Sequence, residues 1–211
     1  MPTNQFLNLE EEKQNRIIQA AIAEFSQYGY ENASTNRIVK ACEISKGSLF
    51  KYFLGKEELY LFILDVVTTE YTDALMREIK ELSTDLFERI KEYSVREFTW
   101  YAKQPQKAKL ILDAFKKDGN DLYFKITERY EKKELDIYFK CLEGMNDCVY
   151  SCDKQMLSDI LRWFLKGFNE DFMNRIQGEQ GDFETMKNLY IEKLSAYLEI
   201  VKYGLLKDAQ Q

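Results

Sequence analysis

Residues 34–56 read Ser34-Thr35-Asn36-Arg37-Ile38-Val39-Lys40-Ala41-Cys42-Glu43-Ile44-Ser45-Lys46-Gly47-Ser48-Leu49-Phe50-Lys51-Tyr52-Phe53-Leu54-Gly55-Lys56. Ser34 or Thr35 is a suitable cap for a short helix ending near Cys42, and Ser45 for a second ending near Phe53. The second helix begins with small and basic residues and ends in aromatic ones. This pattern predicts a helix-turn-helix whose second helix enters a DNA major groove.

The start of the second helix has the side chains that a base-reading surface needs. Gly47 lets the backbone approach a base edge or a phosphate, and Lys46 and Ser48 can bond to either. The apolar residues behind this face are expected to pack inward on the first helix: Ile44, Leu49 and Phe53. Three further residues are expected to line the flanking phosphates: Lys51, Tyr52 and Lys56.

Charge is unevenly distributed along the chain. The 211 residues carry a formal net charge of −6, yet residues 34–56 hold five basic side chains against Glu43 alone. This segment is therefore at +4 and the rest of the chain at −10. A local basic face on an acidic body suits a protein that touches phosphates with one end only.

The composition argues against an enzyme and against a bound metal or cofactor. The chain has no histidine, the commonest general base near neutral pH and the commonest metal ligand. Its cysteines match no zinc spacing, so we expect buried thiols, with a redox role for Cys148 and Cys152 as the less favoured alternative. Without a signal peptide or membrane-spanning stretch, a cytoplasmic protein with reduced thiols is expected.

Long segments rich in Glu, Lys, Leu, Ile and Phe, with only two prolines and nine glycines, predict an all-α fold. About nine helices are expected, over residues 10–28, 34–42, 45–53, 56–82, 83–104, 105–117, 121–145, 153–176 and 182–203. Residues 1–8 are expected to form a loose polar arm, and Gly29 a left-handed helix stop. The predicted domains are residues 1–55, with three helices, and residues 56–211.

A longer pattern joins the helix-turn-helix to its flanks: Arg16-x-x-x-Ala20-Ala21-x-x-x-Phe25-x-x-x-Gly29-Tyr30, then Ser34-x-x-x-Ile38-Val39, then Ile44-Ser45-Lys46-Gly47-x-Leu49-Phe50-x-Tyr52-Phe53-x-x-Lys56-Glu57-x-Leu59. Over residues 10–60 it resembles the tetracycline-repressor (TetR) family. The resemblance implies a three-helix DNA-binding domain, a larger helical ligand-binding and dimerisation domain, and a homodimer built mainly from the last two long helices. By position, it implies DNA contacts from Thr35, Asn36, Ser45, Lys46, Gly47, Ser48, Phe50, Lys51, Tyr52 and Lys56.

Three residues depart from the family pattern. Glu43 stands where the family has glycine. A glutamate there strains a left-handed turn by on the order of 1 kcal/mol and places a negative charge near DNA. Phe50 replaces a tyrosine and loses its hydroxyl, and Leu54 replaces a commonly polar residue. Together these changes are expected to weaken DNA affinity or to alter the choice of operator.

The larger domain is rich in aromatic residues, for which core packing is the simpler interpretation. The resemblance also implies a pocket for a small apolar or aromatic ligand, for which we select Trp100, Phe124, Tyr138 and Trp163. The last two helices have wide apolar stripes that could pack within the subunit or against a twin in a four-helix interface. The residues assigned to this interface are Ile160, Phe164, Phe168, Met186, Tyr190, Leu194 and Tyr197.

We therefore expect a sequence-specific regulator of transcription, a homodimer on double-stranded operator DNA that acts as a repressor and is released by a small-molecule effector. The alternative is a helical dimerisation and ligand-binding module with weakened DNA binding, which Glu43 and Phe50 favour. An all-helical enzyme would need convergent acid–base or metal groups, which the sequence does not supply.

Overall fold

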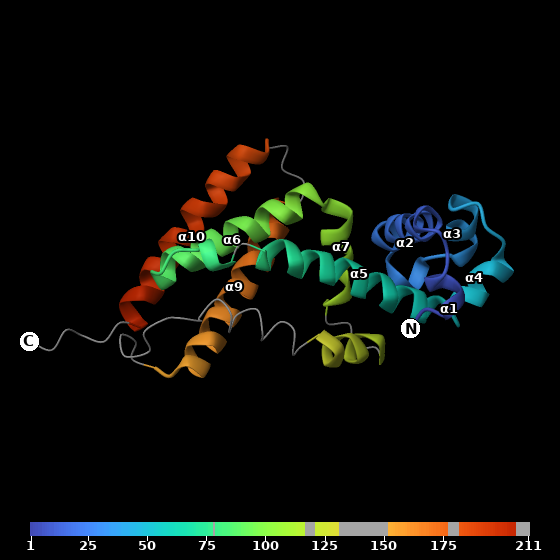
Figure 1. Ribbon diagram of the computed structural model, residues 1–211. Helices are drawn as coiled ribbons and strands as arrows, with labels where there is room; N and C mark the ends of the chain where they lie inside the picture. Colours follow the sequence, from blue (N-terminus) through green and yellow to red (C-terminus); the bar gives the residue numbers. More distant parts are fainter. Residues whose placement is uncertain (78, 117–120, 131–151, 177–181, 206–211) are drawn as a thin grey trace, which may run out of the picture. The chain divides into compact units, whose positions relative to one another are not determined.

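The computed structural model describes residues 1–77, 79–116, 121–130, 152–176 and 182–205 (Figure 1). These residues form nine α-helices, one 3₁₀ turn and a further helical stretch at 121–130, with no β-strand among them, which confirms the all-α prediction. The elements are α1 (Asn4–Leu7), α2 (Glu11–Asn32), α3 (Thr35–Ala41), α4 (Lys46–Tyr52), α5 (Lys56–Met76), η1 (Ile79–Glu81), α6 (Leu86–Lys103), α7 (Pro105–Ala114), α9 (Lys154–Ile176) and α10 (Phe183–Leu205). No helix in the described ranges is long and apolar enough to cross a membrane.

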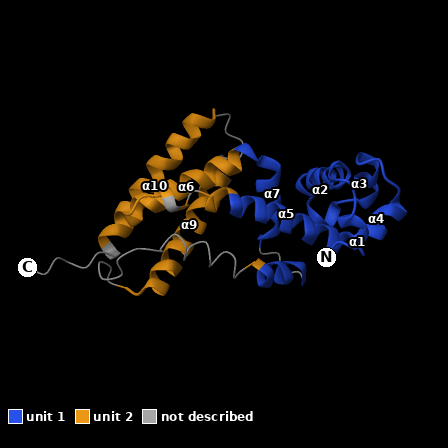
Figure 2. Ribbon diagram, in the orientation of Figure 1, with its two compact units in different colours: residues 1–73, 103–129 blue, residues 74–102, 130–211 orange. Residues whose placement is uncertain are grey.

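The chain divides into two compact units, shown in Figure 2. The first comprises residues 1–73 and 103–129, and therefore holds α1 to α4, most of α5, and α7. The second comprises residues 74–102 and 130–211, including α9 and α10. The first unit is thus larger than a domain of residues 1–55, because α7 packs on α2.

The core of the first unit is formed by the inward faces of α2, α3 and α4. Ile17 and Phe25 of α2, Ile38 of α3 and Leu49 of α4 are all almost completely buried, as their helical spacing predicts. Each of these helices is too short or too polar to be stable alone, so burial of these side chains holds the three together.

The expectation of a loose arm at residues 1–8 is wrong. Asn4–Leu7 form the short helix α1, and the Phe6 side chain has no exposed surface at all. Its ring lies against those of Phe53 and Phe62, with centroids 4.9 and 5.2 Å away. Burial of this one ring stabilises the docked position of the segment. No periodic pattern in the sequence predicts it.

Several helix limits differ from the predicted ones. Gly29 has the expected positive φ of 69°, but the chain regains helical turns beyond it and α2 continues to Asn32. α5 ends at Met76 and is followed by η1, whereas one helix to residue 82 was expected. Of the helix predicted over 121–145, residues 121–130 are helical and residues 131–145 lie outside the described part.

The second unit packs α6, α9 and α10 around one apolar cluster. Phe98 of α6, Leu165 and Phe172 of α9, and Tyr190 and Leu194 of α10 meet there and are buried. Two consecutive hydrogen bonds link polar side chains beside this cluster. The Tyr190 hydroxyl donates to Asn169 Oδ1 (2.6 Å), and Asn169 Nδ2 donates to the buried Glu97 carboxylate (2.7 Å). Burial, together with the Glu97 charge, raises the pKa of the Tyr190 phenol.

Candidate nucleic-acid interface

Helix α4 begins at a side-chain cap and exposes one face. Ser45 Oγ accepts a hydrogen bond from the Ser48 N–H (3.0 Å) and lies 2.8 Å from Ser48 Oγ, so the predicted cap is confirmed. Lys46, Gly47 and Phe50 are exposed. Because Leu49 and Tyr52 of the same helix are buried, this face cannot rotate away from solvent.

Gly47 has no structural reason to be glycine. It lies in a regular helix, and a Cβ added there would meet only Ser45 Oγ, at an ordinary contact distance of 3.8 Å. Alanine is the better helix former by roughly 0.5–1 kcal/mol. Internal packing therefore leaves the glycine unexplained, whereas the close approach of an external partner to the α4 backbone would require it.

Helix α3 packs against α4, and one of its basic residues is held in an internal ion pair. Asn36 is exposed and Thr35 is half-buried. Arg37 donates from Nη2 and Nε to Glu24 Oε1 (2.6 and 2.9 Å), and its guanidinium lies 4.1 Å from the centre of the Tyr28 ring. Glu24 is buried and also accepts from the Ser34 N–H (2.7 Å), so this ion pair fixes the start of α3.

Two of the residues expected to line phosphates have internal roles. Lys56 Nζ donates to the carbonyls of Tyr30 (2.8 Å) and Glu31 (3.0 Å), where α2 ends without helical partners for them. Tyr52 is only 8% exposed and packs edge-on against Phe6. Lys56 thus caps α2 and Tyr52 belongs to the core, which leaves little of either for a phosphate.

Three lysines on α3 and α4 keep exposed side chains and form no ion pair within the described residues: Lys40, Lys46 and Lys51. The Lys46 amine lies 6.0 Å from the centre of the Phe50 ring, a weak cation–π contact. Because Arg37 and Lys56 are occupied, the cationic surface of the segment is smaller than its five basic residues suggest.

The departures from the family pattern lie on or beside this surface. Glu43 has a φ of 55° and is the only non-glycine residue with positive φ in the described part, so the predicted strain is present. Phe50 is exposed, and Leu54 is 84% exposed immediately after α4. All three present to solvent a group that cannot attract a phosphate.

Replacing Glu43 by glycine is expected to raise the free energy of unfolding by roughly 0.5–1 kcal/mol, since glycine adopts positive φ without a steric penalty. Urea denaturation of the two proteins would measure the difference. Glu43→Gln, which removes the charge and keeps the Cβ, is the control and should leave stability within about 0.5 kcal/mol. Equal stability of the glycine variant and the parent would show that the turn is unstrained.

The four residues selected for a ligand pocket are not brought together. Trp100 is buried, but Phe124 and Trp163 are 60% and 64% exposed, and Tyr138 lies outside the described residues. Phe124 belongs to the first unit, whereas Trp100 and Trp163 belong to the second. Exposed rings enclose nothing in a single chain, so Trp100 is the only one of the three described residues with the burial that a pocket wall requires.

Residues selected for the dimer interface divide between core and surface. Tyr190 and Leu194 are buried in the core of the second unit, which is a correction: their stripe faces α6 and α9 rather than outward. Ile160, Phe164, Phe168 and Met186 are half-buried at the edge of the same cluster. Tyr197 is exposed, together with four residues that were not selected: Met156, Trp163, Ile200 and Tyr203.

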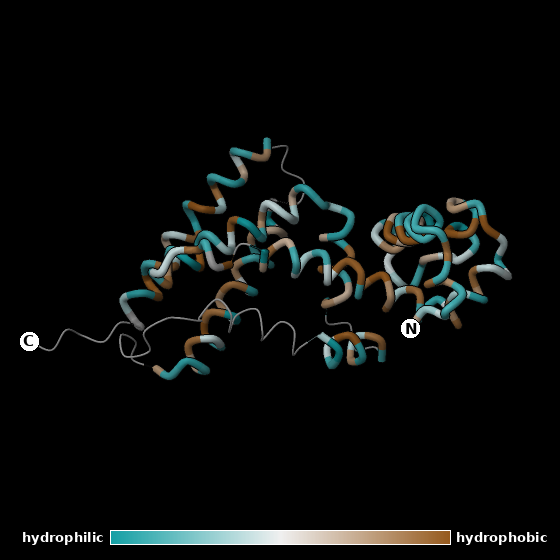
Figure 3. The backbone as a smooth tube through the Cα atoms, in the orientation of Figure 1, coloured by the Kyte–Doolittle hydropathy of each residue, from teal (hydrophilic) through white to brown (hydrophobic). Residues whose placement is uncertain are grey.

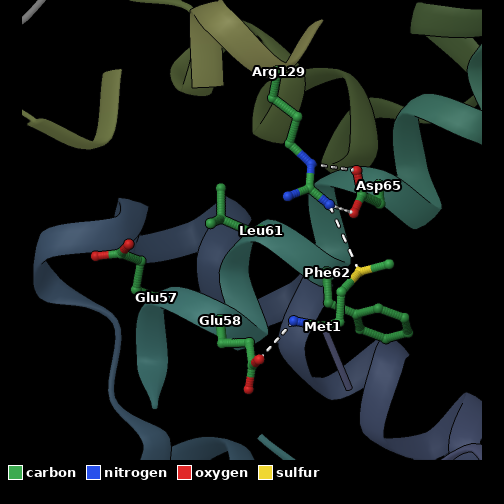
Figure 4. A pocket seen from close by; sticks show the side chains of 7 residues that line it. All are labelled: Met1, Glu57, Glu58, Leu61, Phe62, Asp65 and Arg129. Atoms are coloured by element: carbon green, nitrogen blue, oxygen red, sulfur yellow. Dashed lines mark hydrogen bonds and ion pairs between the residues drawn. The ribbon is translucent and has the colours of Figure 1, made fainter. Parts of the chain in front are cut away.

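A cavity of about 210 Å³ opens in the first unit, lined by α5 residues and by Met1 and Arg129 (Figure 4). Its three carboxylates are already neutralised: Asp65 by Arg129, Glu57 by Lys125 (2.6 Å), and Glu58 by the Met1 ammonium group (2.6 Å). Small-molecule sites usually measure about 300–1,000 Å³ and are mainly apolar. This cavity is therefore a poor effector site.

The described cysteines are not primed for redox chemistry. Burial raises the pKa of the Cys42 and Cys152 thiols, which disfavours the reactive thiolate. Cys148 lies outside the described residues. In the part of the chain that the structure describes, no group of three histidine, cysteine or acidic residues could hold a metal ion.

Comparisons with known proteins agree with this geometry. Residues 17–62 match the family model described as bacterial regulatory proteins, tetR family. The chain is 38% identical over 73 residues to the uncharacterized HTH-type transcriptional regulator YuxN of Bacillus subtilis (strain 168), a match that covers 35% of this chain and 24% of YuxN. The chain thus spans about a quarter of that relative's length.

Solved structures share the whole fold. A TetR family transcriptional regulator from Chloroflexus aurantiacus J-10-fl superposes with a TM-score of 0.68 at 20% identity, covering 98% of this chain and 99% of that one. The transcriptional regulator FadR from Bacillus subtilis, solved in complex with stearoyl-CoA, gives 0.63 at 16% identity, with 86% and 97% covered. Residues 17–62 therefore form a helix-turn-helix segment of the tetR family of bacterial regulatory proteins, and the chain as a whole has the fold of the solved TetR family regulator.

Proposed function

We propose that the chain binds double-stranded operator DNA as a homodimer and that α4 reads the major groove. The observation that carries this proposal is Gly47: an exposed glycine on a capped helix, flanked by Lys46 and Phe50, where internal packing would accept alanine. A base pair or phosphate that comes close to the α4 backbone would explain the glycine, because any side chain there would be in the way. In this arrangement Lys40 of α3 and Lys51 of α4 contact the phosphates that flank the base pairs read by α4.

Gly47→Ala separates the two explanations of the glycine. It is expected to raise the free energy of unfolding by roughly 0.5–1 kcal/mol. It is also expected to lower affinity for an operator duplex, selected in vitro from random sequences, by about tenfold to a hundredfold, since a dimer carries two such contacts. Fluorescence anisotropy at fixed salt measures the affinity, and thermal unfolding measures the stability.

Lys46→Ala and Lys51→Ala test the same surface through charge, and Lys103→Ala at the exposed end of α6 is the control. The first two are expected to weaken binding and to reduce the slope of log affinity against log salt, whereas the control leaves both unchanged. If no duplex is enriched by the parent protein, or if affinity is unaffected by all three variants, the proposal fails. The alternative of a dimerisation module with weakened DNA binding would then be preferred.

We also propose that a second copy covers the exposed apolar faces of α9 and α10. Met156 and Trp163 lie on one side of α9, and Tyr197 and Ile200 on one side of α10, all more than half exposed; Figure 3 shows apolar residues recurring along both helices. Several large apolar side chains exposed on two neighbouring helices favour an interaction site there. A dimer is also what two operator half-sites one helical turn apart require.

A small-molecule effector that releases the protein from DNA completes the proposal, with repression as its mode. The effector can act only through different affinities for the DNA-binding and released states. The aromatic interior of the second unit, with Trp100 and Phe98, suits an apolar or aromatic ligand. Because FadR of similar fold was solved with stearoyl-CoA, long-chain acyl compounds are the first to test, by their ability to lower operator affinity.

A further inference from the structure

The last turn of α4 is closed by a residue far away in the sequence. The final carbonyls of a helix have no partner within it and are usually satisfied by the residues that follow. Here the next residue, Phe53, is extended (φ −137°, ψ 134°), and the Leu54 N–H donates to Glu58 Oε2 (2.6 Å). The chain after α4 therefore turns its donors away from the Lys51 and Tyr52 carbonyls.

Thr3 supplies both missing donors. Its hydroxyl donates to the Lys51 carbonyl (2.8 Å) and its backbone N–H to the Tyr52 carbonyl (3.0 Å). The segment is held in place by Phe6, one turn further on, which is buried against Phe53 and Phe62. Residues 3–6 thus form a cap that is anchored in the core and bonded to the end of the candidate recognition helix.

We infer that Thr3 is a positioning residue for DNA binding, acting through Lys51; this inference rests on the proposed function. Thr3 bonds the main chain of the residue whose exposed amine is proposed to meet a phosphate. A frayed last turn would let the Lys51 Cα move and would spread its side chain over more conformations. Fixing that turn before binding reduces the entropy lost when the amine settles on the phosphate.

Thr3→Val removes the hydroxyl and keeps the shape, and Thr3→Ser keeps the hydroxyl. With the in vitro selected operator, Thr3→Val is expected to bind about fivefold to thirtyfold more weakly, since a dimer loses two hydrogen bonds. Its log–log salt slope should fall towards that of Lys51→Ala. Thr3→Ser should bind within about twofold of the parent protein.

A double-mutant cycle separates positioning from a general structural role. In the Lys51→Ala background, Thr3→Val should have no further effect, because the group that it positions is gone. A loss that persists in this background would mean that Thr3 acts through the stability of the domain, and the inference would be wrong. Equal affinity of Thr3→Val and the parent would also overturn it, while leaving the proposed function intact. A parent protein that binds no duplex specifically would instead refute the proposed function.

Discussion

Phe6→Ala is expected to lower the free energy of unfolding by about 3–5 kcal/mol, the range found when a fully buried phenylalanine is removed from a packed core. The Phe6 ring has no exposed surface and lies within 6.1 Å, centre to centre, of three other rings, those of Tyr52, Phe53 and Phe62. Such aromatic pairs add to the energy of area burial alone. Urea denaturation monitored by far-ultraviolet circular dichroism would measure the loss.

The neighbouring Leu7 provides a matched control. It lies in the same short helix but is more than half exposed, so Leu7→Ala should change stability by less than about 0.5 kcal/mol. If the segment undocks without unfolding the rest, the global transition moves less, and the hydrogen bonds from Thr3 to the Lys51 and Tyr52 carbonyls are lost first. Amide exchange at the end of α4 then increases in Phe6→Ala alone. Equal stability of the two variants would show that residues 1–8 are the loose arm first expected.

Local signals explain why α3 and α4 could be predicted from the sequence. Ser45 is a helix cap whose partner is three residues away, and Leu49 and Phe53 follow at helical spacing, so the information lies within nine residues. Glu43 could be assigned to a strained turn for the same reason. α1 could not be predicted, because one phenylalanine in a polar stretch has no period, and its partners are about fifty residues away.

Charged residues at the site show a second limit. The sequence counts five basic residues in 34–56, but it cannot tell a lysine in solvent from one that caps another helix. Arg37 is held by Glu24, and Lys56 by carbonyls of α2, in contacts that span 13 and up to 26 residues. Only the folded chain reveals that Lys40, Lys46 and Lys51 keep exposed side chains and form no ion pair within the described residues.

The apolar stripes of α9 and α10 show a third limit of prediction from the sequence. Their period predicts two amphipathic helices, but each helix has apolar residues on more than one side, so the period does not say which side faces the core. Tyr190 and Leu194 face the core, while Ile200 and Tyr203 face solvent. An interface with a second copy must therefore be sought on the outer sides.

Trp163→Glu combined with Ile200→Glu is expected to convert the proposed dimer into a folded monomer. Both side chains are largely exposed in the single chain, at 64% and 70%, so the carboxylates cost the isolated fold little. In a dimer they would be buried without a partner, a penalty of several kcal/mol for each charge. Sedimentation equilibrium would measure the mass, and circular dichroism would confirm that helix content is retained.

Loss of the dimer should lower operator affinity by about 10²–10⁴-fold. Each α4 then binds its half-site alone, and the second contact is no longer intramolecular. Asn188→Glu is the control: this residue is exposed on α10, on a different side from Ile200, and its variant should remain dimeric and bind normally. A double variant that stays dimeric would place the interface elsewhere. A monomer that retains full affinity would show that one α4 is sufficient, and the link between the outer faces of α9 and α10 and DNA reading would be lost.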